Sequence, residues 1–230
     1  MSPRSKNHDR QGNLRESIKE TAWNQIEESG AAALSLRSIA QVLGITAPAI
    51  YNYYPNRDAL VTALIRDAFQ SFGDSQLAAR DAVPEADLRG RMTALGLAYR
   101  SWAHEFPERY GLMFGTPFPG FVLEPEQILP VGARALGVLA GVVEAMRKTG
   151  LLKATGIPSI MSTCADSFDA WKRYGGDIVE ESFALAVLIW AAVHGLVSLE
   201  LSRNIPPFGP RGDALYRYQL EALKRQFVKD

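Results

Sequence analysis

Residues 35–57, SLRSIAQVLGITAPAIYNYYPNR, decide the fold of this 230-residue chain. Two short helical patterns flank Gly44: LRSIAQVL follows Ser35, which can cap it, and APAIYNYY follows Thr46. A tight turn between helices needs a residue that adopts positive φ, and glycine does so without strain. Two short helices joined in this way form a helix-turn-helix. Helical spacing recurs along most of the chain and strand signals are scarce, so we expect an all-α fold.

Apolar spacing separates the inner face of this motif from its outer face. In the second helix Ile50 and Tyr54 are four residues apart and would face inward together. Tyr51 and Tyr53 then lie away from the buried face. The apolar inner face of the first helix consists of Leu36, Ile39, Ala40 and Leu43.

The outer residues of the motif have the chemistry of a DNA-binding surface. Tyrosine hydroxyls and the Arg57 guanidinium can reach phosphate oxygens, and Arg37 can contact phosphate or a base edge. The alternative is a plain αα-hairpin with half-buried tyrosines. The ordered combination of cap, glycine turn, small residues, aromatics and arginine disfavours that alternative. The candidate DNA-binding residues are Arg37, Thr46, Ala47, Pro48, Ala49, Tyr51, Asn52, Tyr53 and Arg57.

The stretch LSLRSIAQVLGITAPAIYNYYPNRDALVTALI, residues 34–65, resembles the DNA-binding domain of the TetR family of bacterial transcriptional regulators. The family's run of Gly, an apolar residue, Ser or Thr, and then Leu-Tyr-x-His-Phe is matched from Gly44 to Tyr54. Tyr53 stands where histidine is commoner and Arg57 where lysine is commoner, and both substitutes can bind phosphate. The resemblance covers about residues 12–72. It implies an N-terminal three-helix DNA-binding domain with its motif at about residues 35–54.

Two later stretches, AYRSWAHEFPERYGLMFG (98–115) and WAAVHGLV (190–197), look like one subclass of TetR-family C-terminal domain. The subclass is named for its Trp, His and Gly, here Trp190, His194 and Gly195. The resemblance implies that residues 85–230 form a helical ligand-binding and dimerisation domain. It also implies a homodimer through the last two helices and a pocket for a small molecule. Residues 73–87 lose helical periodicity and would connect the two domains.

Charge and cysteine content say little about partners. The chain has 25 basic and 25 acidic residues, so any basic surface must be local, such as an N-terminal arm with Arg4, Lys6 and Arg10. Cys164 is the one cysteine, which fits a reducing cytoplasm. The polar N-terminus has no apolar core of the kind found in signal peptides. We therefore expect a cytoplasmic protein.

The apolar stretch 183–201 is nearly long enough to span a bilayer. His194 near its middle and Glu200 near its end disfavour a membrane helix and favour a helix buried between subunits. The last helix has an apolar seam suited to another helix, and burial inside a monomer is the alternative to a dimer. The seam consists of Tyr216, Leu220, Leu223 and Phe227.

Aromatic and sulfur-containing side chains are dense between residues 99 and 194. Taken singly, each is more often core than ligand contact, and His194 can satisfy its hydrogen bonds internally or with a ligand. Charges are scarce in this region, so a pocket would favour a neutral or weakly polar aromatic or aliphatic molecule. The candidate ligand-binding residues are Tyr99, Trp102, Tyr110, Phe114, Phe118, Cys164, Phe168, Trp171, Trp190 and His194.

Catalytic and metal-binding patterns are missing from the sequence. It has no HExxH, GxSxG, cysteine pair or Gly-rich phosphate loop, and no His, Cys and carboxylate cluster with ligand spacing. We therefore expect no enzyme, no metal and no cofactor. The predicted protein is a dimeric repressor that binds a palindromic operator in double-stranded DNA and is released by a small hydrophobic effector. The alternative is a helical ligand-binding protein, or an enzyme acting on a small apolar molecule without DNA.

Overall fold

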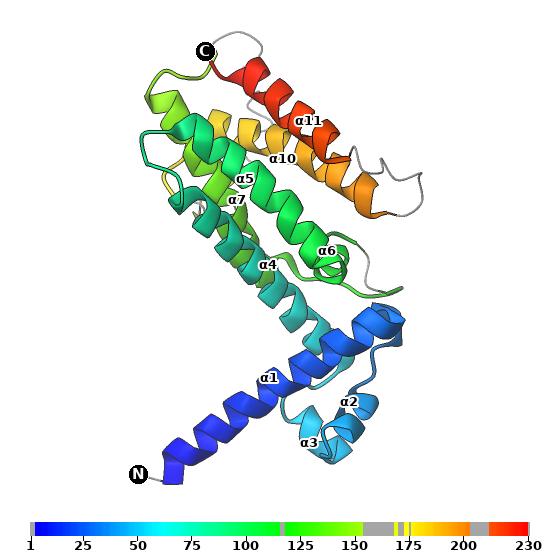
Figure 1. Ribbon diagram of the computed structural model, residues 1–230. Helices are drawn as coiled ribbons and strands as arrows, with labels where there is room; N and C mark the ends of the chain where they lie inside the picture. Colours follow the sequence, from blue (N-terminus) through cyan, green and yellow to red (C-terminus); the bar gives the residue numbers. More distant parts are fainter. Residues whose placement is uncertain are drawn as a thin grey trace. The chain divides into compact units, whose positions relative to one another are not determined.

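The computed structural model describes residues 3–115, 118–153, 168–169, 173–174, 176–202 and 212–229, without the side chains of residues 3–12. Within these ranges the elements are helices, apart from an isolated antiparallel bridge between Leu152 and Val228 (Figure 1). The all-α prediction is confirmed. The chain forms two compact units, which we call the first unit (Met1–Ala68 with Glu108–Gln127) and the second unit (Phe69–Pro107 with Ile128–Asp230).

The first unit contains the predicted helix-turn-helix. Helix α1 (Pro3–Ser29) is followed by Gly30 at φ 78° and by the single turn η1 (Ala31–Ala33). Helices α2 (Leu36–Val42) and α3 (Ala47–Tyr51) come next, and Gly44 between them has φ 64°, as the turn requires.

Two boundaries in the first unit differ from those predicted. The spacing of Leu14, Ile18, Ala22 and Ile26 predicts a first helix that starts near Gly12, whereas helix α1 begins at Pro3. Helix α3 ends at Tyr51 and does not continue to Tyr54. Pro55 explains why Tyr54 lies outside the helix, since a residue that precedes proline is pushed out of the α region.

Helix α4 (Arg57–Asp81) is longer than predicted. Asn56 directly precedes the helix and caps it, with Oδ1 accepting the Ala59 N–H at 2.8 Å. The helix continues through Gly73, where we expected it to end. A Cβ added at Gly73 would lie 3.5 Å from Ala135, so this glycine allows close packing between helices and does not break the helix. The predicted connection over residues 73–87 is wrong up to residue 81.

The second unit contains the remaining part of α4, together with α5 (Leu88–Glu105), most of α7 (Pro125–Lys148), α10 (Glu180–Leu201) and α11 (Gly212–Phe227). Helices α5, α10 and α11 pack against one another (Figure 1). Gly96 of α5 lies against Leu220 of α11, and Tyr216 donates its hydroxyl hydrogen to the Gly96 carbonyl. The predicted apolar seam of α11 is buried against its own chain: Tyr216, Leu220, Leu223 and Phe227 are each less than a tenth exposed.

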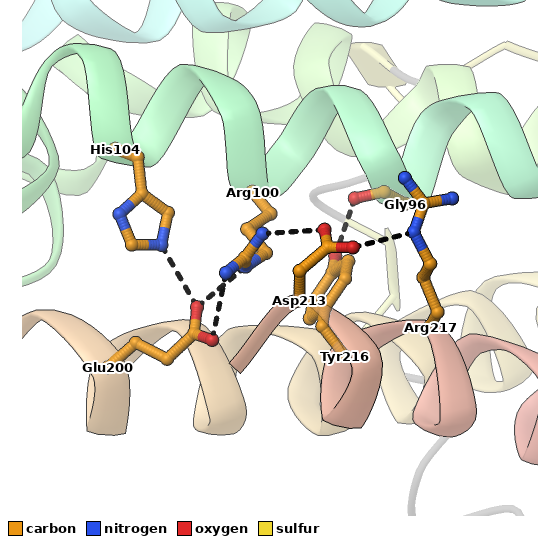
Figure 2. Close-up of polar contacts among 7 residues, drawn as sticks. All are labelled: Gly96, Arg100, His104, Glu200, Asp213, Tyr216 and Arg217. Carbon is orange, nitrogen blue, oxygen red and sulfur yellow. Dashed lines mark hydrogen bonds and ion pairs between the residues drawn. The ribbon is translucent and has the colours of Figure 1, made fainter. Parts of the chain in front are cut away.

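A polar network ties the same three helices together at one end (Figure 2). Glu200 of α10 accepts hydrogen bonds from Arg100 Nε at 2.8 Å and from Arg100 Nη2 at 3.2 Å, and it contacts His104 Nε2 at 3.0 Å. Arg100 also pairs with Asp213 of α11 at 3.2 Å. The Glu200 side chain is 6% exposed, so removal of these partners would leave a buried carboxylate without hydrogen bonds.

Two described helices, α7 and α10, are long and apolar enough to cross a membrane by length and composition alone. In their most apolar windows 44% and 39% of the residues are buried inside the protein. Core helices of soluble proteins pass the same test, so this observation is weak evidence for a membrane span.

Candidate DNA-binding surface and effector cavity

The inner face of the helix-turn-helix is buried as predicted, except that Leu43 is half-buried. Ile50 is 0% exposed and Tyr54 is 4% exposed. Their burial turns Tyr51 and Asn52 outward, where both are exposed, and leaves Tyr53 half-buried. An aromatic hydroxyl and an amide are therefore presented on the outer side of α3.

The N-terminus of α3 is small and open. Thr46 and Pro48 are exposed, and Ala47 and Ala49 are half-buried. Pro48 fits the first turn because the N–H that it lacks would have no partner within the helix. Thr46 occupies the N-cap position with extended backbone, yet its hydroxyl makes no capping bond to the helix. The place of Thr46 directly before the helix predicts a side-chain cap, and this prediction is wrong, whereas Ser35 does cap α2 by accepting the Ser38 N–H at 3.4 Å.

The two candidate arginines differ in their surroundings. Arg37 is exposed on the first turn of α2. Arg57, at the start of α4, is half-buried: its guanidinium carbon lies 3.6 Å from the centre of the Phe118 ring. Arg57 Nη1 also donates to the Ala32 carbonyl at 3.1 Å.

The second unit contains a cavity of about 40 Å³. This volume holds a few water molecules and is far smaller than a pocket that surrounds a drug-sized ligand. Its wall is mostly aliphatic, with polar groups from Gln76, Thr93, Tyr99 and Lys224. The other lining residues are Met92, Leu95, Gly96, Leu139, Ile189, Trp190, Val193, Leu220 and Leu223.

His194 lies next to this cavity and is hydrogen-bonded within the protein. Its Nδ1 lies 2.8 Å from the Tyr99 hydroxyl, and its Nε2 lies 3.2 Å from the Ser198 hydroxyl. Burial lowers the pKa of His194, because the cation would lose hydration. The imidazole is therefore a neutral group that orients Tyr99, which itself lines the cavity.

The predicted ligand-binding residues belong to both units, and two of them line the cavity. Tyr99 and Trp190 line the cavity. Trp102 is buried and donates from Nε1 to Ser71 Oγ at 3.1 Å, and Phe168 stacks on Phe183 with ring centres 6.2 Å apart. Tyr110, Phe114 and Phe118 belong to the first unit. Cys164 and Trp171 lie outside the described residues.

Sequence reasoning found Tyr99 but missed the other polar residues that line the cavity, Gln76, Thr93 and Lys224. Gln76 is 5% exposed, and its amide can donate to the Leu95 carbonyl and accept from the Tyr99 N–H, each at 3.2 Å. Nothing in the local sequence marks it, because it lies in the part of α4 that we expected to be a connection. Lys224 could have been found from the α11 seam, since it follows Leu223 directly.

Within the described ranges no group of three or more His, Cys, Asp or Glu residues could hold a metal ion.

The fold and the outward-facing α3 define a helix-turn-helix transcriptional regulator that binds DNA. Residues 18–64 match the bacterial regulatory proteins of the tetR family, and residues 92–223 match the tetracyclin repressor-like C-terminal domain. This chain belongs to the TetR family, a family of regulators and not of enzymes.

Relatives support the assignment over nearly the whole chain. The HTH-type transcriptional regulator Rv1816 of Mycobacterium tuberculosis is 32% identical over 200 residues, which cover 85% of this chain and 84% of that protein. The regulatory protein SCO4313, whose crystal structure is known, is 31% identical in sequence to this chain. The two structures match with a TM-score of 0.74 over 94% of this chain and 97% of that one. A protein from Rhodococcus sp. RHA1, 21% identical, has the same fold with a TM-score of 0.72 over 94% and 96% of the two chains.

Proposed function

We propose that this protein is a dimeric repressor that binds a palindromic operator and leaves it when a small hydrophobic effector enters the second unit. The observation that supports DNA reading most directly is the orientation of α3, with Ile50 and Tyr54 buried and Tyr51 and Asn52 exposed. Its small, open N-terminus can approach base edges closely in a major groove.

The candidate residues divide into positioning and reading roles. Tyr51, Tyr53 and Arg57 contact phosphates and set the register of the protein on the duplex. Arg37 and Asn52 supply hydrogen-bonded base reading. The four residues at the start of α3, Thr46, Ala47, Pro48 and Ala49, offer contacts suited to thymine methyl groups and to nearby phosphates.

The last two helices supply the dimer contact. Leu188, Ala191 and Leu199 are exposed along one side of α10, and a Cβ added at Gly195 between them would meet open space. Helix α11 exposes Leu215, Tyr218 and Ala222 at similar spacing. An apolar strip of this kind on two neighbouring helices favours a symmetric partner. A dimer would bring two helix-turn-helix motifs (α2 and α3, the reading head of each subunit) to one palindrome.

The cavity beside Tyr99 and Trp190 is the effector site. Its aliphatic wall favours a neutral or weakly polar molecule, and its small volume means that a ligand must widen it on entry. Such a change lets a ligand favour one conformation over another. A protein of similar fold, SmeT, has a solved structure in complex with triclosan. It is 17% identical, with a TM-score of 0.62, and the match covers 94% of this chain and 92% of that one. We assign the C-terminal domain to the subclass marked by Trp190, His194 and Gly195, and we place the protein in the cytoplasm.

The test is a footprint on the DNA that flanks the protein's own gene, together with selection of duplexes from a random-sequence pool. We expect a protected palindrome, and affinity that falls as salt is added. Replacing Tyr51 or Tyr53 by Phe should weaken binding to all sequences alike, because a phosphate contact carries no base information. Tyr53→Phe that binds normally but melts at a lower temperature would make that residue structural.

Base preference provides the second part of the test. The Arg37→Ala, Asn52→Ala double variant should lose discrimination between the selected palindrome and its single-base variants, at about 1–3 kcal/mol for each lost bidentate contact. An unchanged preference would remove both residues from the reading role. If no duplex is retained and the protein instead turns over a small apolar compound, the alternative function holds.

A further inference from the structure

The sequence FPGF at residues 118–121 forms a tight turn within the first unit. The Phe121 N–H donates to the Phe118 carbonyl at 3.2 Å, and Gly120 has φ 81°. A type II β-turn has this bond, favours proline at its second position and needs glycine-like φ at its third. Pro119 and Gly120 meet both requirements. The two phenylalanine rings lie 5.2 Å apart at 64°. The turn thus fixes the backbone from which Phe118 projects.

Phe118 is 5% exposed and carries the Arg57 side chain on its ring. The separation of 3.6 Å from the guanidinium carbon to the ring centre is well within the range of a cation–π contact. The bond from Arg57 Nη1 to the Ala32 carbonyl fixes a second point of the same group. A guanidinium has five N–H donors in one plane, so one bond leaves it further capacity to donate.

The segment that carries Phe118 packs in the same unit as the helix-turn-helix, although the two lie far apart in the sequence. Glu108–Gln127 forms one compact unit with Met1–Ala68. A second contact repeats the pattern, because the Arg109 guanidinium carbon lies 5.2 Å from the centre of the Trp23 ring of α1. Two arginine–aromatic contacts therefore join this segment to α1 and to the start of α4.

We propose that Phe118 is a positioning residue for DNA binding: its ring holds the Arg57 guanidinium in place at the reading head before DNA arrives. This inference rests on the proposed phosphate contact of Arg57 and adds the group that orders it. A free arginine side chain loses much rotamer entropy when it is immobilised at an interface. A stacked arginine has lost that freedom already, so the phosphate contact forms at lower cost.

The experiment measures binding of the full chain to a fluorescein-labelled duplex of mixed sequence. Phosphate contacts act on any sequence, so no operator is needed. Affinity is measured between about 50 and 200 mM salt. Arg57→Met should reduce the magnitude of the slope of log affinity against log salt by about 0.9 per subunit, and so by about 1.8 for the dimer. Phe118→Leu should weaken binding roughly 2- to 10-fold per subunit, the cost of ordering one side chain. The double variant should bind no more weakly than Arg57→Met, and Phe118→Tyr, which keeps the ring, should bind like the wild type.

Two glycine variants provide a matched pair. A Cβ at Gly120 would meet open space, so Gly120→Ala strains only the backbone at positive φ and disturbs the turn. It should weaken DNA binding in the same way as Phe118→Leu. Gly111 in α6 (Pro107–Phe114) also faces open space but has helical backbone, and Gly111→Ala should bind DNA as the wild type does.

The outcomes separate this inference from the proposal beneath it. If Arg57→Met leaves the salt slope unchanged, Arg57 contacts no phosphate and both statements fail. If Arg57→Met lowers the slope but a folded Phe118→Leu variant binds like the wild type, only the positioning role is overturned. Circular dichroism establishes folding. Should Phe118→Leu fail to fold, Arg57→Lys decides, because lysine keeps the charge without the planar group. Weaker binding by Arg57→Lys supports the inference, and wild-type binding overturns it.

Discussion

The Tyr99 hydroxyl lies 2.8 Å from Nδ1 of His194. Ser198 Oγ approaches the other ring nitrogen at 3.2 Å. A neutral imidazole has one donor and one acceptor nitrogen, so it can donate to one hydroxyl and accept from the other. This arrangement fits the uncharged histidine that burial favours by lowering the pKa.

The first prediction concerns stability and pH. Since the folded pKa of His194 is lowered from 6.5, the unfolded chain binds the proton more tightly than the folded chain. Stability should be fully present well above pH 6.5 and should fall as the pH drops through that value. Thermal melts of wild type and His194→Gln on both sides of this pH check it, and the variant should lose less stability on acidification. Equal losses of stability in the two proteins would show that groups other than His194 cause the loss at low pH.

The second prediction concerns the close approach of α5 and α11. A Cβ added at Gly96 would lie 2.5 Å from Leu220 Cδ2 and 3.1 Å from Cδ1. Gly96→Ala should therefore cost about 1–3 kcal/mol of unfolding free energy through overpacking. Gly141→Ala is the control, because that site in α7 is exposed and an added Cβ meets nothing within 4 Å. The control should gain about 0.5–1 kcal/mol from helix propensity. Urea titrations measure the unfolding free energy of both variants, which should fall in Gly96→Ala and rise in Gly141→Ala.

The third prediction compares a buried carboxylate with an exposed one. Glu200→Ala removes the acceptor of Arg100 and the partner of His104 (Figure 2), and should cost about 1.5–3 kcal/mol. Glu221→Ala removes a partner of Lys224 and Arg225 at a carboxylate that is 48% exposed, and should cost much less, because water screens exposed ion pairs. Chemical denaturation of the two variants measures the difference. Similar costs would mean that burial of Glu200 adds nothing.

Local patterns were sufficient for the reading head. The spacing of Ile50 and Tyr54 predicted which side of α3 is buried, and Gly44 marked the turn by its need for positive φ. The same local reasoning failed at Gly73. The residue is helical because a neighbouring helix, which lies far along the chain, packs against it at Ala135. Tertiary packing overrides propensity at such positions.

Sequence patterns predicted the candidate ligand-binding residues less well than they predicted the helices. Phe118 was predicted as a ligand contact because aromatic residues cluster along that part of the sequence. The structure places it beneath Arg57, and sequence spacing carries no information on a contact between residues so far apart. Gln76 was missed for the same reason, since its polar partners are backbone groups of another helix. Its role depends on three-dimensional packing alone.

The fourth prediction concerns the apolar strip on α10 and α11. Leu188 is 51% exposed on α10 and Tyr218 is 73% exposed on α11. Leu188→Glu and Tyr218→Glu should convert the dimer to a monomer, because a buried, unpaired carboxylate is costly at an interface. Val122→Glu is the control, since Val122 is 71% exposed in the other unit. Sedimentation velocity gives the mass of each variant. A wild-type chain that sediments as a monomer contradicts the dimer outright.

The last prediction concerns the effector cavity, which is open to a direct test by filling it. Val193 lines the cavity, is 4% exposed and lies between Trp190 and His194 on α10. Val193→Phe should occupy the small empty volume and exclude a ligand while leaving the helix-turn-helix unchanged. Hydrophobic compounds are titrated into the complex of protein with its selected duplex. In the wild type, an effector should weaken DNA binding roughly 5- to 150-fold, the range of ordinary allosteric coupling. In Val193→Phe the duplex should bind normally and the release should be lost. Trp102→Phe is the comparison, because Trp102 is equally buried but is not among the residues that line this cavity. Release that persists in Val193→Phe, or that requires a multiply charged compound, would place the effector site elsewhere in the protein.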